Sequence, residues 1–192
     1  MKLKNNSIQI SCDGGAATGK STGAKMIAKK YNLKFLSSGL LYRYAAFLIL
    51  KNRPRNKINF LKKKFKKLNY KKLDKINLHT VQISELSAII AKKNKVRNIL
   101  KKFQIDFSKK NPNCCIEGRD ISTKILPNSD LKFFFKCDLN KAAKRRFKEL
   151  KKREPKIKIN DVKRALKTRN ILDTKRKNSP LLRHRDSIEI DT

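Results

Sequence analysis

The stretch from Ser7 to Tyr31, SIQISCDGGAATGKSTGAKMIAKKY, constrains the fold of this chain more than any other. Apolar residues alternate with polar ones in its first part, which predicts a strand with one side towards the core. Residues 14–21, GGAATGKS, then match the pattern G-x-x-x-x-G-K-[S/T] without a mismatch. Apolar residues spaced i, i+3, i+4 and i+7 follow and predict an amphipathic helix. Strand, glycine-rich turn and helix are the context that a phosphate-binding loop requires.

The residue types in this turn suit a phosphate ligand. Small residues let successive backbone N–H groups wrap an anion, and the following helix directs its positive end to the same place. We expect Lys20 to reach the β- and γ-phosphates of a nucleotide and the Ser21 hydroxyl to ligate Mg²⁺. The alternative is a glycine-rich turn that precedes a helix by chance, and the flanking strand and helix argue against it.

Length and apolar content set broad limits. The chain of 192 residues, 39% of them hydrophobic, is long enough for one sizeable core. No run approaches about 18 consecutive apolar residues, so the sequence predicts no membrane span. Its start leads straight into the first strand, which leaves no room for a signal peptide, and we therefore expect a cytoplasmic protein.

The cysteines have no spacing that suggests a metal site. Cys12, Cys114, Cys115 and Cys137 all lie in apolar, strand-like stretches. Buried, reduced thiols are the expected state.

The chain is strongly basic, because 51 lysines and arginines against 15 acidic residues give a formal net charge of +36. Such a charge is typical of nucleic-acid binders. The excess is mostly lysine and is spread over nearly the whole chain, which favours a general bias towards lysine and asparagine at surface positions. Non-specific attraction to RNA or to anionic substrates is expected under either interpretation.

Short apolar runs alternate with helical patterns along the rest of the chain. The runs that predict strands are residues 33–36, 114–116, 131–137 and 187–190. The patterns that predict helices cover residues 40–50, 57–75, 78–91, 96–107, 138–152 and 160–169. Strands that alternate with helices indicate an α/β fold with a parallel sheet, whose ligands gather at the C-terminal ends of the strands.

Three polar clusters follow predicted strands or lie in predicted loops. They are SSGLLYR at residues 37–43, EGRD at residues 117–120, and a set formed by Arg169, Asp173 and Arg176. Guanidinium groups neutralise phosphates through paired hydrogen bonds, and transfer between two phosphates requires like charges to be brought together. Each arginine taken alone is more often a solvated surface residue. Together, beside a phosphate loop, the clusters favour phosphoryl transfer between two anions.

In these stretches the sequence resembles the bacterial cytidylate kinases, which are P-loop nucleoside monophosphate kinases. The matching segments, in order, are IQISCDGGAATGKST, FLSSGLLYR, KVRNIL, CIEGRDISTKILP, DLKFFFKCDLNKAAKRRFKEL and the pattern K-x-R-x-x-x-D-x-x-R-x-x-x-P-L at residues 167–181. The resemblance implies a three-layer P-loop NTPase fold with a central parallel five-stranded sheet of order 2-3-1-4-5. It also implies a single domain with a core (1–38, 108–145 and 170–192), a helical monophosphate-binding insert (about 39–107) and a mobile lid (about 146–162).

The activity implied by the resemblance is Mg²⁺-dependent transfer of the ATP γ-phosphoryl group to CMP or dCMP, by a monomer, in pyrimidine nucleotide metabolism. The residues implied to bind ATP are Gly14, Gly15, Ala16, Ala17, Thr18, Gly19, Lys20, Ser21, Thr22 and Arg145, with Ser21 on the metal. Those implied to bind the cytidylate are Ser38, Arg43, Arg97, Arg119, Asp120, Arg169 and Asp173. The implied catalytic set is Lys20, Arg119, Arg169 and Arg176.

Several positions depart from the family pattern. Ser37 stands where the family usually has Asp, and Ser122 where it usually has Gly. Ala88 aligns with the serine that helps to read cytosine, and its neighbour Ser87 is the substitute if the helix register shifts. Asn170 and the two residues after it replace residues that are usually charged.

Two other functions stay open from the sequence. One is another P-loop kinase that acts on a different small molecule, against which the FLSSGLLYR and GRDIST segments argue. The other is a basic RNA-binding P-loop protein without kinase activity, for which salt-sensitive RNA affinity without phosphotransfer would be the sign.

Overall fold

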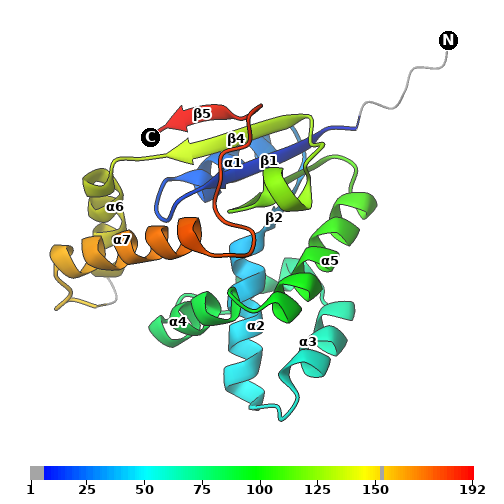
Figure 1. The fold of residues 1–192 in the computed structure, drawn as a ribbon, viewed down its shortest axis with the longest axis horizontal. Helices are drawn as coiled ribbons and strands as arrows, with labels where there is room; N and C mark the ends of the chain where they lie inside the picture. The colour runs from blue at the N-terminus through cyan, green and yellow to red at the C-terminus, as the bar shows by residue number, and fades with distance from the viewer. Residues whose placement is uncertain (1–6, 152–153) are drawn as a thin grey trace. The chain divides into compact units, whose positions relative to one another are not determined.

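The computed structural model describes residues 7–151 and 154–192. Within these residues a five-stranded sheet has the order β2-β3-β1-β4-β5 (Figure 1). β1 pairs in parallel with β3 and β4, and β4 pairs in parallel with β5. The predicted α/β class, parallel sheet and strand order are confirmed. The strands are β1 (Gln9–Gly14), β2 (Lys34–Ser37), β3 (Cys114–Gly118), β4 (Leu131–Lys136) and β5 (Ile188–Asp191).

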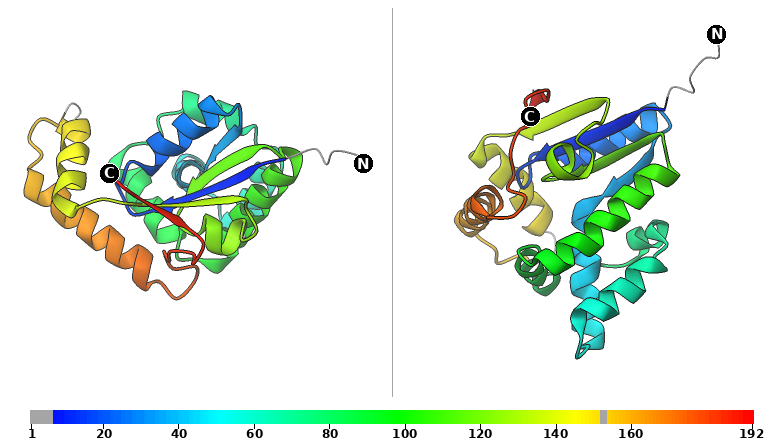
Figure 2. Two further views of the ribbon diagram at one scale, coloured as in Figure 1. Left: turned by 90° about the horizontal axis from the view of Figure 1, so that it is seen from above. Right: turned by 45° about the vertical axis from the view of Figure 1, so that its right-hand side comes forward.

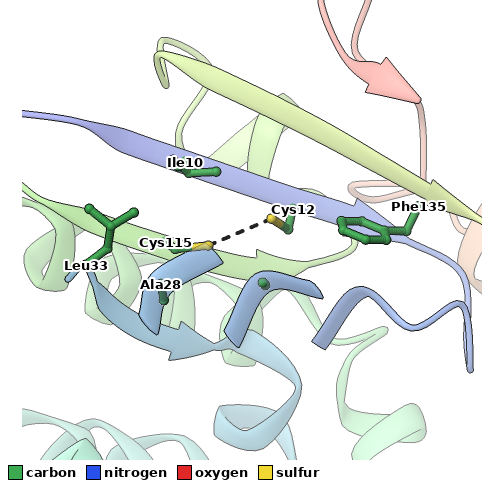
Figure 3. Close-up of a cluster of buried hydrophobic side chains, with 7 residues drawn as sticks. Ile10, Cys12, Ala28, Leu33, Cys115 and Phe135 are labelled. Atoms are coloured by element: carbon green, nitrogen blue, oxygen red, sulfur yellow. Dashed lines mark hydrogen bonds between the residues drawn. The ribbon is translucent and has the colours of Figure 1, made fainter. Parts of the chain in front are cut away.

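The strand, turn and helix predicted from residues 7–31 are present, with α1 (Lys20–Lys30) following β1. One face of β1 packs against α1 in an apolar core, which is shown in Figure 3 and contains Ile10, Cys12, Ala24, Ala28, Leu33, Cys115 and Phe135. The predicted side of this strand does face the core, and Ser11 and Asp13 on its other side are also fully buried. β1 is a central strand, and both of its faces are covered.

The chain divides into two compact units, Met1–Phe35 with Asn113–Thr192, and Leu36–Pro112. Besides β1, β3, β4, β5, α1 and the first two residues of β2, the first unit contains η2, a π-helix (Ile121–Ile125), α6 (Leu139–Lys151) and α7 (Ile159–Lys175). The views of Figure 2 show α6 and α7 side by side. Their facing apolar residues form a second core, into which Ala16 of the glycine-rich turn also packs.

Apart from Leu36 and Ser37, which end β2, the regular elements described in the second unit are helical. Its elements are α2 (Ser38–Asn52), α3 (Lys57–Lys66), the 3₁₀ helix η1 (Tyr70–Lys75), α4 (Val81–Ile90) and α5 (Asn94–Lys110). α2 packs on α3, α4 and α5. Edge-to-face contacts of Phe65 with Tyr44 and Phe103 join α2, α3 and α5.

A single helix over residues 57–75 is predicted from the sequence, and this prediction is wrong. α3 ends at Lys66, and a separate 3₁₀ turn begins at Tyr70. The side chain of Asn69 accepts a hydrogen bond from the N–H of Lys71, so it caps a new element instead of continuing the old one. None of the helices in the described part of the chain combines the length and apolar character that a membrane span needs.

Candidate active site

The glycine-rich turn joins β1 to α1 and contains two positions that require glycine. A Cβ on Gly14, whose φ is +156°, would lie 2.3 Å from the backbone oxygen of Phe135 on the neighbouring strand. Gly19 has a φ of +74°, in the left-handed region that favours glycine, and it is the N-cap of α1. The Thr18 hydroxyl donates a hydrogen bond of 3.2 Å to the carbonyl of Gly15 across the turn. The turn therefore has the close backbone approach expected of a phosphate loop.

Lys20, the first residue of α1, is buried under this loop. Its Nζ donates to the carbonyl of Gly15 at 3.2 Å and lies 3.9 Å from the carboxylate of Glu117 at the end of β3. Burial, together with the positive charge of Arg119, lowers the pKa of Lys20 to about 7 in spite of the opposing effect of Glu117. Because Glu117 only partly offsets the cost of burying the Lys20 ammonium group, an anion bound at the loop would stabilise its charged form.

Two arginines and two aspartates form a network beside Lys20, in which Asp120 is buried and the other three side chains are partly buried. The Nε of Arg119, directly after β3, donates to Asp173 Oδ2 at 2.9 Å. Arg176 Nη1 lies 3.4 Å from Asp173 Oδ1, and its Nη2 lies 3.9 Å from Asp120 Oδ1. Burial alone would raise the pKa of Asp173, but Arg119, Arg169 and Arg176 outweigh burial and lower it. The charge of Arg169 also acts on Lys20, so these predicted site residues lie together in the first unit.

Asp173 lies on a helix, whereas a loop position is predicted from the sequence. α7 continues to Lys175, beyond the predicted end near Arg169, and Arg176 is its C-cap residue. Ile171 and Leu172 are exposed on this extension, so the apolar periodicity that would have indicated a helix is lost there.

Arg145 connects α6 to the phosphate loop through Thr192. Its Nη1 donates to the Thr192 hydroxyl at 2.9 Å, and that hydroxyl donates to the backbone oxygen of Thr18 at 3.1 Å. Ser21 and Thr22 are exposed in the first turn of α1. No group of three or more His, Cys, Asp or Glu side chains that could hold a metal occurs in residues 7–151 and 154–192.

Three of the predicted cytidylate-binding residues belong to the second unit, where two arginines are held by hydrogen bonds. Arg43 Nη1 donates to the Ser84 hydroxyl at 2.7 Å and to the carbonyl of Leu78 at 3.1 Å. Arg97 is buried, and its Nη1 donates to the carbonyl of Ala91 at 3.1 Å. The third residue, Ser38, is buried at the start of α2.

Where the resemblance predicts a serine that reads cytosine, α4 carries the hydroxyls of Ser84 and Ser87. Ser87 is buried, and its hydroxyl donates a hydrogen bond of 2.7 Å to the carbonyl of Ser84, whereas Ala88 is partly buried.

The guanidinium of Arg97 lies 5.7 Å from the ring centre of Tyr42, within the range of a cation–π contact.

Asp13 is a site-supporting residue that sequence reasoning missed. Its fully buried carboxylate accepts hydrogen bonds from the N–H of Ile121 at 2.9 Å, the N–H of Ser122 at 2.8 Å and the Ser122 hydroxyl at 2.6 Å. Burial raises the pKa of Asp13, and the bonds from Ser122 oppose this. These bonds attach η2, which directly follows Arg119 and Asp120, to β1. The signal in the sequence was only a polar residue within an apolar strand.

A phosphate loop between β1 and α1 of a parallel sheet of order 2-3-1-4-5 defines a P-loop kinase fold. Two solved structures share this fold. One is an uncharacterized protein from Eubacterium ventriosum, with a TM-score of 0.52 and 17% identity over 97% of this chain and 90% of that chain. The other is from Thermus thermophilus, with a TM-score of 0.50 and 16% identity over 96% of this chain and 88% of that chain.

The sequence comparisons identify the family. A family model described as cytidylate kinase matches residues 10–192. The cytidylate kinase of Fusobacterium nucleatum is 34% identical, over 97% of this chain and 90% of the relative. Those of Mesomycoplasma hyopneumoniae and Rickettsia canadensis are also 34% identical, over 96% and 95% of this chain and 86% and 84% of the relatives. The chain belongs to the cytidylate kinase family, and its activity is that of a nucleoside monophosphate kinase that uses ATP.

Proposed function

We propose that the chain transfers the γ-phosphoryl group of ATP to the phosphate of CMP or dCMP, with Mg²⁺ as cofactor, and so forms ADP and CDP or dCDP. The observation that carries the proposal is the grouping of Lys20, Arg119, Arg169 and Arg176 in one unit beside the phosphate loop. Four cations in this arrangement can offset the repulsion between a triphosphate and a second phosphate.

The donor side is assigned to residues 14–22 and Arg145. The loop N–H groups and Lys20 hold the ATP phosphates, and Lys20 is fully protonated once they surround it. The exposed Ser21 hydroxyl fits a Mg²⁺ ion that takes its other ligands from phosphate oxygens and water, as Mg²⁺ commonly does. Bound Mg²⁺ supplies neutralisation of charge on the β- and γ-phosphates.

The acceptor side is assigned to Ser38, Arg43, Arg97, Arg119, Asp120, Arg169 and Asp173. The carboxylates of Asp120 and Asp173 keep the guanidinium groups of Arg119 and Arg176 in fixed directions, which reduces the reorganisation needed during transfer. We assign no general base, because the acceptor phosphate is already an anion and a loose transition state needs little proton removal.

The division into core, insert and lid belongs to the same proposal. Residues of about 146–162 would close over ATP and exclude water, which limits ATP hydrolysis. Most of this segment lies in α6 and α7, and residues 152–153 are outside the described part of the chain. A monomeric state and a cytoplasmic location stay predictions.

The test is ADP release measured with a panel of CMP, dCMP, UMP and AMP. CMP or dCMP should be turned over at least about tenfold more efficiently than the others, because a site built to hydrogen-bond one base rejects others strongly. Equal rates with UMP or AMP would refute the cytidine assignment. Lys20→Ala should lower kcat by about 100-fold or more, whereas Lys29→Ala, an exposed lysine of the same helix, is the matched control.

Weak RNA affinity is a second property that charge supports. A hollow of about 490 Å³ in the second unit is lined in part by Lys63, Lys64, Lys67 and Lys72 of the α3–η1 segment. We expect this affinity to be independent of RNA sequence and to fall steeply with salt. Filter binding of two unrelated RNA oligomers at low and high salt tests it, and equal binding at both salt concentrations would contradict it.

A further inference from the structure

One contact between α7 and the phosphate loop has no role in the transfer described above. Asn170 Oδ1 accepts a hydrogen bond of 3.0 Å from the N–H of Ala16. A Cβ on the preceding loop residue, Gly15, would lie 3.1 Å from the same oxygen. The amide of Asn170 therefore fits closely against the loop backbone at two successive residues.

The contact joins two structures that are already packed together. Ala16 is buried in the apolar core formed with Ala142, Ala143, Val162 and Leu166 of α6 and α7. An N–H group in such surroundings needs an acceptor, since an unsatisfied buried donor costs about 1–3 kcal/mol. Asn170 supplies that acceptor from the helix itself.

The spacing along α7 relates this contact to the charged network. Leu166, Asn170 and Asp173 are separated by four and three residues, so they share one face of the helix with Arg169. Leu166 packs in the core, Asn170 reaches the loop, and Asp173 accepts the hydrogen bond from Arg119. A rotation or slide of α7 would break the Asn170 contact and displace Arg169 and Asp173 together.

We propose that Asn170 is a positioning residue, which fixes the register of α7 on the phosphate loop and thereby holds Arg169 and the Arg119–Asp173 pair at a set distance from Lys20. The role rests on the proposed function for the part that these arginines play. A neutral amide suits the position, because a carboxylate would make the same hydrogen bond but add negative charge beside the loop that receives a triphosphate.

The experiment compares Asn170→Ala and Asn170→Asp with the wild type and with Thr168→Ala, which alters an exposed polar residue of the same helix outside the proposed lid. We expect Asn170→Ala to lower kcat by about 10- to 100-fold while the KM for ATP changes by less than about threefold, because the arginines are displaced and the loop stays intact. Asn170→Asp keeps the acceptor, so it should restore kcat to within about threefold of the wild type and raise the KM for ATP. Thr168→Ala should behave as the wild type.

Two results would overturn the role. One is an Asn170→Ala enzyme with unchanged kcat at 25 °C, whether or not its melting temperature falls. The other is an Asn170→Asp enzyme no more active than Asn170→Ala. A wild type that does not phosphorylate CMP would instead refute the proposed function, so the two failures are distinguishable.

A double-mutant cycle with Gly15→Ala gives an independent check. The added methyl group should push the Asn170 amide away from Ala16 and lower kcat in the wild-type background. In the Asn170→Ala background the same substitution should cost at least about fivefold less, because the crowded group is gone. Additive losses in kcat would overturn the proposed coupling.

Discussion

The ammonium group of Lys20 lies 3.9 Å from the carboxylate of Glu117, and both side chains are buried at the end of the central strands. Burial and the positive charges of Arg119 and Arg169 outweigh the attraction of Glu117 at this distance, so Lys20 is only weakly held in its charged form. Its pKa of about 7 means that the free protein carries a partly protonated lysine at neutral pH. The family resemblance assigns no role to Glu117. The parallel pairing of β3 with β1 brings its carboxylate close to Lys20, which directly follows the loop after β1.

Nucleotide binding should therefore take up a proton. Phosphates raise the pKa of Lys20, so at pH 8, above its value of about 7 in the free protein, binding of ATP requires protonation. Calorimetry at pH 8 in buffers of different ionisation enthalpy should give an uptake that approaches one proton. At pH 6 the uptake should be close to zero, since Lys20 is already charged. Absence of uptake at pH 8 would contradict the lowered pKa.

The lowered pKa of Lys20 also determines how the free energy of unfolding changes with pH. Between pH 7 and 10.5 the unfolded chain, with its ordinary lysine pKa, holds a proton that the folded chain has released. The contribution of Lys20 to the free energy of unfolding should therefore increase with pH across this range. Urea unfolding of the wild type and of Lys20→Met measures this contribution as the difference between their free energies of unfolding. A wild-type value that falls relative to that of Lys20→Met from pH 7 to 9 would contradict the prediction.

The donor side of the site could be predicted from sequence because its parts are contiguous. The loop motif, β1 and α1 lie within residues 7–31, and local pattern alone located them. The family resemblance supplied the arginines of the distant segments, and Arg119, Arg169 and Arg176 do lie in one unit. The contacts of Asn170 and Asp13 were missed because each depends on a backbone N–H more than 100 positions away, which no local pattern encodes.

Ser122 should contribute to stability through Asp13. Its hydroxyl donates a 2.6 Å hydrogen bond to the buried carboxylate. A hydrogen bond to a charged group contributes about 1.5–3 kcal/mol, so Ser122→Ala should lower the free energy of unfolding by about 2 kcal/mol. Urea denaturation at pH 7 measures the loss.

Ser108→Ala is the matched control for this substitution. Ser108 is also buried, but its hydroxyl donates to the neutral carbonyl of Ile105, so the loss should be clearly smaller. Equal losses for the two variants would show that the charge on Asp13 is irrelevant. Ser122→Gly, which introduces the residue usual in the family, should be at least as destabilising as Ser122→Ala, because glycine also adds freedom to the unfolded chain.

Asp173 should matter for the acceptor more than for ATP. Asp173→Asn keeps an oxygen that can accept from Arg119 but removes the charge that balances Arg119 and Arg176. The arginines then lose their fixed directions, and kcat/KM for CMP should fall by about 100-fold with little change in ATP affinity. Asp186→Asn, which alters an exposed carboxylate just before β5, should leave both unchanged. A loss confined to ATP affinity would argue against the assignment of Asp173 to the acceptor side.

The reactivity of each cysteine towards a thiol reagent should depend on how deeply it is buried. Cys12, Cys114 and Cys115 are fully buried, and Cys137 is partly exposed. The hydrogen bond between the thiols of Cys12 and Cys115, 3.8 Å apart, together with burial, raises the pKa of Cys12, and burial raises that of Cys114 to about 12. Because the thiolate is the reactive form, Ellman's reagent should label the native protein at Cys137 first, with the others reacting only on unfolding.

Cys137→Ser provides the control for this division, since it should abolish the fast phase and leave the total after unfolding lower by one thiol. Rapid labelling of the Cys137→Ser protein under native conditions would mean that β1 and β3 open readily. That result would be incompatible with a rigid sheet beneath the phosphate loop, because Cys12 lies on β1 only two residues before the loop begins at Gly14.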